Sequence, residues 1–200
     1  MTFAPELLTS DPSHLPDFTL DPTTETGGRF VERGVRDFRS AARHVMLVPY
    51  GRNADRSDYR LVLEEDRGTC STKHALLAAL SREHGSPVEL RLGIYEMDDK
   101  NTPGTGPVLR RYGLDFVPEA HCYLAYRGVR VDLTRVGEAR EPIQAFLHEE
   151  EIEPLRIGTY KVTCHREYIH RWASARSLNP ETVWQAREEC IQVLSGIEST

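Results

Sequence analysis

A tight β-hairpin is the feature that most constrains how this chain can fold. The segments His121–Tyr126 (HCYLAY) and Val129–Thr134 (VRVDLT) have the composition of strands, and only Arg127 and Gly128 separate them. Two residues are enough for an antiparallel turn when glycine supplies the positive φ. The chain is therefore expected to contain an antiparallel sheet, in which Tyr126 pairs with Val129.

Helical patterns precede and follow this hairpin. Apolar residues at three- and four-residue spacing from Val31 to Val45 predict one helix that ends near Pro49–Gly51. A second helix should run from Cys70 to about His84, and alternation over Val88–Ile94 predicts a strand. Further helices are expected over residues 142–149, 165–176 and 179–194. This order of elements is typical of the α+β class.

The composition indicates one ordinary domain. Residues 1–28 contain four prolines and few aliphatic residues, so they are expected to form an extended or mobile amino-terminal arm. Residues 29–200 are expected to form a single domain with carboxy-terminal helices. The formal net charge of −6 argues against a dedicated nucleic-acid-binding protein.

The sequence also carries expectations about location and cofactors. It has no apolar run of about 18 residues and no signal-peptide pattern, so a cytoplasmic protein with no membrane partner is expected. The four cysteines show no paired spacing and should be free thiols, and no metal or other cofactor is expected. The pattern does not indicate an oligomeric state.

Cys70 is the first candidate for chemistry. It follows Arg67–Gly68–Thr69 and immediately precedes the second predicted helix. A helix amino terminus lowers the pKa of a thiol, and the thiolate is the form that attacks. The alternative is that Cys70 is a small buried apolar residue, which is the usual fate of a free cysteine. Its polar neighbours favour the first interpretation.

His121 and Asp132 are candidate partners of this thiol. His121 opens the first strand of the hairpin, and Asp132 interrupts the apolar second strand, where a carboxylate needs a partner. Counting out from the turn, Asp132 should pair with Tyr123, which leaves it two residues short of His121. A diagonal contact or a β-bulge would bring the carboxylate to the imidazole and fix its tautomer.

The segments RGTCSTKHALLAAL, EAHCYLAY and VRVDLT resemble the core of the transglutaminase-like superfamily. The resemblance covers roughly residues 59–134, including the strand after the cysteine helix. It implies a papain-like fold, in which the helix bearing the cysteine packs on an antiparallel sheet bearing the histidine and the aspartate. It also implies that Cys70 is the nucleophile, His121 the general base and Asp132 the residue that orients the base.

The function that follows is thiol acyl transfer on an amide or ester. The enzyme would be a cysteine protease, an amidase or a transglutaminase-like acyltransferase, with a peptide, a protein or a small amide as substrate. Two alternatives remain open. One is a non-catalytic module of the same fold that binds a peptide or protein. The other is an interaction protein whose carboxy-terminal helices carry the function.

An acyl-transfer site also needs donors for the developing oxyanion. The backbone N–H of Cys70 is one candidate, and a side chain of the upstream YGRN stretch is the expected second. That side chain would be Asn53, Arg52 or Tyr50, although the stretch can equally be a simple turn. Two further candidates for the substrate pocket are Glu119, which lies close to the base, and His74, which lies one helical turn after the nucleophile.

Overall fold

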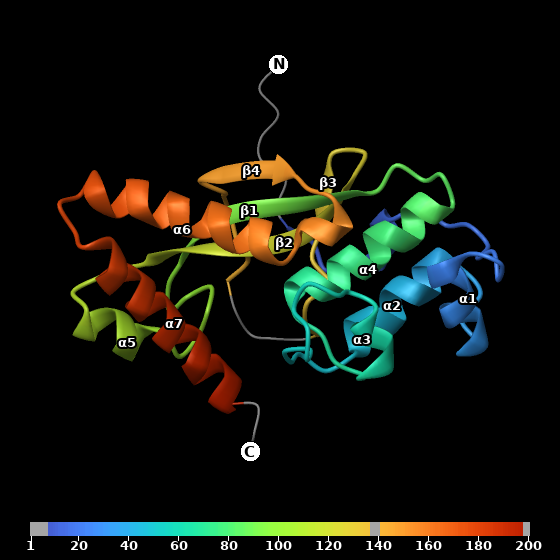
Figure 1. The fold of residues 1–200 in the computed structure, drawn as a ribbon, viewed down its shortest axis with the longest axis horizontal. Helices are drawn as coiled ribbons and strands as arrows, with labels where there is room; N and C mark the ends of the chain where they lie inside the picture. The colour runs from blue at the N-terminus through green and yellow to red at the C-terminus, as the bar shows by residue number, and fades with distance from the viewer. Residues whose placement is uncertain (1–7, 137–140, 198–200) are drawn as a thin grey trace.

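The protein is described by a computed structural model that covers residues 8–136 and 141–197. A four-stranded antiparallel sheet runs through it, with the strand order β3-β2-β1-β4 (Figure 1). The strands are β1 (Glu89–Met97), β2 (Val117–Tyr126), β3 (Val129–Val131) and β4 (His148–Glu151). The combination of an antiparallel sheet with helices confirms the predicted α+β class.

The helices form two groups at opposite ends of the sheet (Figure 1). The first group comprises the 3₁₀-helix η1 (Pro12–His14), α1 (Glu25–Glu32), α2 (Phe38–Leu47), α3 (Leu61–Glu64) and α4 (Cys70–Glu83). The second comprises α5 (Gly106–Arg111), α6 (Thr159–Ser174) and α7 (Pro180–Ile197), with the 3₁₀-helix η2 (Pro154–Arg156) before α6.

Each group of helices buries one end of the sheet. The first core cluster joins α1, α2 and α4 to sheet residues such as Leu90, Leu92 and Leu124. The second joins α5, α6 and α7 to Tyr95, Met97 and other residues at the far ends of β1 and β2. The sheet therefore connects two apolar clusters, one at each of its ends. Side chains near the middle of the sheet can contact residues from both helical groups.

The hairpin between β2 and β3 forms as predicted. Arg127 and Gly128 have φ values of 50° and 85°, which is the positive-φ pair of the turn whose twist matches antiparallel strands. Tyr126 pairs with Val129, in the predicted register. The second strand is shorter than expected and ends at Val131, because the Leu133 N–H, the next donor toward β2, donates to Nε2 of His74 at 2.8 Å.

Helix α4 also begins and ends where the sequence places it. Thr69 is its N-cap in a reciprocal capping box with Thr72, and Gly85 follows its end with a φ of 65°. Every residue from Cys70 to Ser81 is buried. The amino terminus of this central helix is therefore held in the interior, with Cys70 in its first turn.

The predicted helix over residues 31–45 is wrong as a single element. The chain breaks after α1, where Gly34 has a φ of 79°, and Asp37 then caps α2 by accepting from the Ser40 N–H at 2.8 Å. Helix α6 begins six residues earlier than the predicted start at His165. Helix α7 begins at Pro180 as predicted, and Asn179 caps it.

The predicted helix over residues 142–149 is also wrong. Residues His148–Glu151 form β4 and pair with β1. The ring of Phe146 packs directly against Gly93, where any Cβ would collide with it, and stacks on Tyr123 with ring centroids 4.8 Å apart. These contacts hold the segment along the edge of β1, so tertiary packing overrides the weak strand propensity of HEEE.

The described part of the amino-terminal arm lies on the domain. Leu15 and Leu20 are buried in the first core cluster, and Thr9 pairs with Val131 of β3. The predicted boundary at residue 28 falls inside α1, so it does not separate two structural units. Residues 1–7 of the predicted arm lie outside the described residues.

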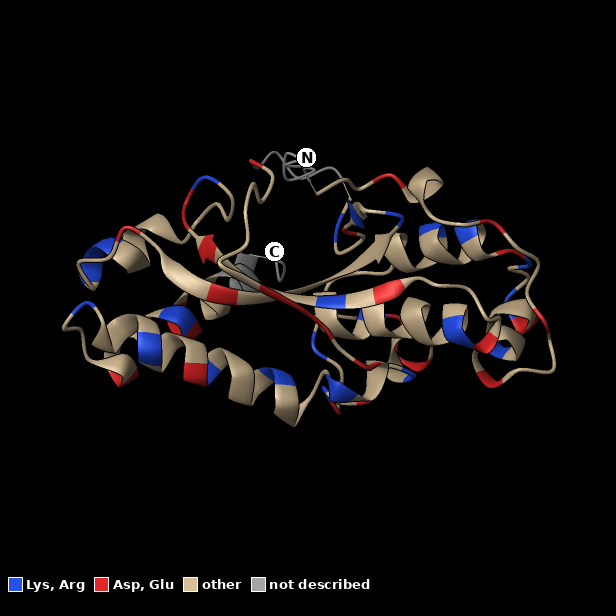
Figure 2. Ribbon diagram, turned by 90° about the horizontal axis from the view of Figure 1, so that it is seen from above, with Lys and Arg blue, Asp and Glu red and all other residues tan. Residues whose placement is uncertain are grey.

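Charged residues are distributed over the whole surface. Figure 2 shows acidic and basic residues interspersed along the helices, and an acidic run along β4, whose sequence is HEEE. In the part of the chain that the structure describes, no helix has both the length and the apolar composition needed to span a bilayer.

Candidate active site

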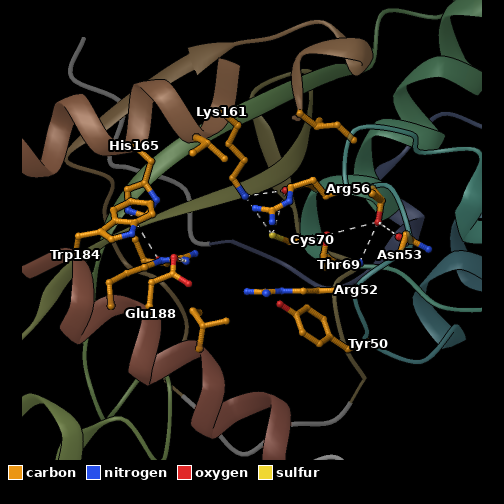
Figure 3. Close-up of a pocket in the computed structure, with 17 residues that line it drawn as sticks. Tyr50, Arg52, Asn53, Arg56, Thr69, Cys70, Lys161, His165, Trp184 and Glu188 are labelled. Carbon is orange, nitrogen blue, oxygen red and sulfur yellow. Dashed lines mark hydrogen bonds and ion pairs between the residues drawn. The ribbon is translucent and has the colours of Figure 1, made fainter. Parts of the chain in front are cut away.

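Cys70 lies in the first turn of α4, at the edge of a cavity of about 160 Å³. The cavity is enclosed by the first turn of α4, the segment around residues 50–56, and one face each of α6 and α7 (Figure 3). Cys70 is 9 % exposed. The backbone N–H of a residue in a first helical turn has no intrahelical acceptor, so this donor is available beside the sulfur.

His121 and Asp132 lie against each other in the interior. Nε2 of His121 lies 3.1 Å from Oδ2 of Asp132, and the two side chains are 9 % and 3 % exposed. This buried nitrogen has no well-aligned hydrogen-bond partner among the described residues, so the contact is an ion pair. The paired part of β2 and β3 has no bulge and ends at Val131, so Asp132 reaches His121 from the segment that follows β3.

The other oxygen of Asp132 is held by its own loop. The N–H of Thr134 donates to Oδ1 of Asp132 at 3.0 Å, and the Thr134 hydroxyl donates to the same atom. A carboxylate fixed at Oδ1 presents Oδ2 to His121 in one orientation. Asp132 is therefore held against the imidazole of His121, and its role in orienting a catalytic base stays a prediction.

His74 is buried and does not line the cavity. Its Nε2 accepts from the Leu133 N–H at 2.8 Å, so the proton must be on Nδ1, which donates to the Cys70 carbonyl at 2.7 Å. Burial lowers the pKa of His74 to about 4, which keeps it neutral near Asp132. The prediction that His74 belongs to the substrate pocket is therefore wrong, and it instead ties α4 to the loop after β3.

The three candidate groups stabilise each other's charged forms. Burial opposes ionisation of Cys70, but the charges of Lys161 and His121 outweigh it and lower the pKa of the thiol from 9.0 to about 6. Burial likewise opposes protonation of His121, but Asp132 and Cys70 raise its pKa to about 10. The pKa of Asp132 falls below its usual range because the effect of His121 exceeds that of burial. A thiolate–imidazolium pair is thus the favoured state near neutral pH.

Lys161 of α6 is a residue of this site that the sequence did not indicate. Its Nζ donates to Oγ of Ser71 at 2.7 Å and lies 3.9 Å from Sγ of Cys70 (Figure 3). Burial lowers the pKa of Lys161, but the neighbouring thiols and Glu119 outweigh burial and leave the pKa raised. The ammonium therefore remains charged beside the sulfur.

Asn53 cannot supply the oxyanion donor that the sequence suggested. Its Nδ2 donates to the Arg67 carbonyl at 2.9 Å and to Oε2 of Glu65 at 3.1 Å, which occupies both amide protons. Its Oδ1 accepts from the Thr72 hydroxyl at 2.9 Å. Asn53 lines the cavity but serves to brace the first turn of α4.

Tyr50 and Arg52 remain available from the YGRN stretch. Burial and the nearby Cys70 raise the pKa of Tyr50 to about 12, so its hydroxyl keeps its proton, and the Arg135 guanidinium lies 4.0 Å over its ring. Figure 3 shows the Tyr50 hydroxyl and the extended Arg52 side chain in the space in front of Cys70. Either residue can donate to an anion that forms there.

Glu119 lines the cavity, as the sequence predicts, but its carboxylate is already engaged. Arg187 of α7 donates to both of its oxygens, at 2.6 and 2.7 Å. Burial raises the pKa of Glu119, but Arg187 and His165 outweigh burial and bring it to about 2. This ion pair joins α7 to β2 and forms one wall of the cavity.

Other contributors were also missed by the sequence analysis. Lys73, which is fully buried, donates to the carbonyls of Val48 and Thr134 and so anchors the loop that carries Asp132. Arg187 lies on helix α7 and Arg56 lies in a polar loop. Arginine normally faces solvent at such positions, so the sequence did not indicate that either residue lines a cavity. The sequence offers no clear signal for Lys73, because its neighbours Ser71, Thr72 and His74 are polar as well.

Comparisons with protein-family models, with curated proteins and with solved structures give no match. The four cysteines are all free, as predicted. Within the described ranges, 8–136 and 141–197, no three His, Cys, Asp or Glu side chains gather in a way that could hold a metal ion. The site is therefore interpreted from the chemistry of its own residues.

Proposed function

We propose that this protein is a thiol acyl-transfer enzyme with a papain-like, transglutaminase-like core, acting on an amide or an ester. The observation that carries this proposal is the convergence of Cys70, His121 and Asp132 from three separate elements. Cys70 comes from the start of α4, His121 from β2 and Asp132 from the exit of β3. The order along the chain and the role of each group match the arrangement expected of such a triad.

The first half-reaction starts from the thiolate–imidazolium pair. Sγ of Cys70 attacks the carbonyl carbon and forms the S–C bond, which moves an electron pair onto the carbonyl oxygen. The Cys70 N–H is one donor to this oxyanion, and the Tyr50 hydroxyl is the candidate second donor. Collapse of the tetrahedral species breaks the C–N or C–O bond, and the proton of His121 goes to the leaving group.

The second half-reaction releases the acyl group from sulfur. His121, now neutral, takes a proton from water or from an amine, which attacks the thioester carbon. The S–C bond breaks, and the thiolate–imidazolium pair forms again. Water gives hydrolysis, whereas an amine gives transfer. Asp132 keeps the imidazole in position throughout.

The experiment that tests this proposal is alkylation by iodoacetamide as a function of pH, with mass spectrometry resolving all four thiols. Cys70 should react fastest at pH 7, with a rate that rises through a pKa of about 6. Burial raises the pKa of Cys122 and of Cys190 to about 11, so these two thiols are internal references. In the His121→Ala variant the advantage of Cys70 should fall sharply.

A Cys70 that titrates like an ordinary thiol, or whose reactivity is the same in His121→Ala, would contradict the proposal. The fold would then be interpreted as a binding module. A positive result would justify screening of neutral and charged thioester, ester and amide probes for turnover, with Cys70→Ser as the inactive control.

A further inference from the structure

The cavity in front of Cys70 is basic, although the protein as a whole carries a formal net charge of −6. Its charged lining consists of four cationic side chains, Arg52, Arg56, Lys161 and Arg187, and the two carboxylates of Glu119 and Glu188. The excess of cations is therefore local. A local excess of positive charge in a recess raises the concentration of anions there.

The two carboxylates of the lining share one cationic partner. Both pair with Arg187, which lies 2.6 Å from Oε2 of Glu119 and 2.8 Å from Oε1 of Glu188. Lys161 in turn lies beside the Cys70 sulfur, whose thiolate balances its charge. Arg187 balances one of the two carboxylate charges, and the other remains at Glu188, whose side chain is 36 % exposed.

Arg52 and Arg56 are left without a partner. Neither side chain forms a hydrogen bond or an ion pair with any residue that the structure describes. Figure 3 shows both guanidinium groups extended into the space in front of Cys70, one on the Tyr50 side and one on the Lys161 side. Two unpaired guanidinium groups that face one small cavity form a clamp for an anion, since each offers a planar fork of donors.

We propose that Arg52 and Arg56 form an anion subsite beside Cys70, and that the substrate is an amide or ester carrying a carboxylate or phosphate close to its reacting carbonyl. This inference rests on the proposed function of the same site and names its substrate class. Formation of the thioester removes the thiolate charge and leaves Lys161 uncompensated. The anion of the acyl group is then held more strongly, which retains the acyl-enzyme for the second half-reaction.

The size of the cavity limits the substrate further. A volume of about 160 Å³ accepts a compact group of a few heavy atoms rather than a long peptide. Ile157, Val162 and Trp184 add apolar surface to the lining. The reacting part of the substrate should therefore be short, with its anionic end toward Arg52 and Arg56.

The first test measures anion binding without catalysis. ¹⁵N-labelled protein is titrated with inorganic phosphate and, separately, with glutarate, and the backbone amides of Cys70 and Ser71 are followed by NMR. The wild type should show saturable shifts with at least one anion, and the anion that binds more tightly identifies the phosphate or carboxylate source. In the Arg52→Gln/Arg56→Gln double variant, affinity should fall about tenfold or more.

The matched control is Arg110→Gln, which removes an exposed arginine from α5, outside the cavity lining. It should bind both anions as the wild type does. Absence of saturable shifts with both anions in the wild type, or equal binding by the double variant, would overturn the subsite.

The second test places the anion beside the nucleophile. Iodoacetate and iodoacetamide differ by one charge, so the ratio of their rates at Cys70 reports the local potential, with the partly exposed Cys164 as the internal reference. The rate with iodoacetate divided by the rate with iodoacetamide should be higher at Cys70 than at Cys164. In the double variant this ratio at Cys70 should fall about tenfold. A ratio equal to that of Cys164 would overturn the proposal. Slow alkylation of Cys70 by iodoacetamide, with anion binding retained, would instead refute the acyl-transfer function and leave the subsite standing.

Discussion

The Nε2 atom of His74 accepts a hydrogen bond from the Leu133 backbone N–H at 2.8 Å. This bond crosses from the helix of the nucleophile to the residue that directly follows Asp132. The other ring nitrogen donates to the carbonyl of Cys70. One neutral imidazole thus sets the spacing between the two ends of the proposed triad, and its neighbour Lys73 holds the same loop at Thr134.

Replacement of His74 tests this role. His74→Ala should destabilise the fold by about 2 to 4 kcal/mol, because it opens a cavity and leaves the Leu133 N–H unpaired. His74→Gln can retain a donor and an acceptor and should cost less. Urea unfolding at pH 7 measures both free energies of unfolding. Equal stability of His74→Ala and the wild type would contradict the role.

The same residue should make stability depend on pH. The pKa of His74 falls from 6.5 to about 4 on folding, so the unfolded chain binds the proton more readily. The free energy of unfolding therefore decreases as the pH falls from about 6.5, and the decrease is complete near pH 4, where it is on the order of 3 kcal/mol. His74→Gln lacks this titration. As the pH falls over that range, the wild type should lose stability relative to His74→Gln. A difference in free energy of unfolding that stays constant with pH would refute the lowered pKa of His74.

The parts of the fold that the sequence predicted correctly depend on residues close in the chain. Gly128 permits the two-residue turn, Thr69 caps α4, and Asn179 caps α7 before Pro180. Each signal is read within a few positions. The same local signals placed Cys70 at a helix start and His121 on a strand of the hairpin, whereas Asp132, which was expected on the second strand, directly follows it.

The errors arose where distant segments decide the outcome. Residues 142–149 were predicted to be helical, but packing of Phe146 on Gly93 holds this segment against β1, where residues 148–151 form β4. The YGRN stretch offered Asn53 as a donor, but Glu65 and Arg67 occupy its amide. Lys161 lies on a helix outside the region of resemblance, and only the packing of α6 against β2 and α7 brings its ammonium to the thiol.

Lys161 should control the acidity of the nucleophile. Lys161→Met removes a positive charge 3.9 Å from Sγ of Cys70, so the pKa of the thiol should rise from about 6 by roughly 1 to 3 units. The pH profile of iodoacetamide alkylation measures this shift. Lys100→Met is the matched control, since it removes an exposed lysine from a loop outside the cavity lining. An unchanged profile in Lys161→Met would contradict the electrostatic role.

Asp132 should act through the imidazole. In Asp132→Asn the ion pair is lost, and the pKa of His121 should fall from about 10 by roughly 1 to 3 units. Turnover of any confirmed substrate should fall by about two to four orders of magnitude. NMR titration of the His121 ring measures the pKa, which separates an effect on the base from general unfolding. Asp115→Asn, at an exposed position, is the control. A His121 pKa that stays near 10 in Asp132→Asn would show that Asp132 is not its partner.

Removal of one partner of the Glu119–Arg187 pair should destabilise the fold strongly, whereas removal of both partners should not. Arg187→Met leaves a carboxylate that is 9 % exposed without its partner, which should cost about 3 to 5 kcal/mol. The double variant Glu119→Gln/Arg187→Met removes both charges and should recover most of that loss. Urea unfolding of the two single variants, the double variant and the wild type gives the coupling free energy.

A second ion pair of α7 is the control for this cycle. Arg111 lies 2.6 Å from Oε2 of Glu189, but its side chain is 62 % exposed, so Arg111→Met should cost at most about 1 kcal/mol. If Arg187→Met were as mild as Arg111→Met, the buried pair would not be what fixes α7 to β2. The wall of the cavity opposite Arg52 would then have to be held by the apolar contacts of α7 alone.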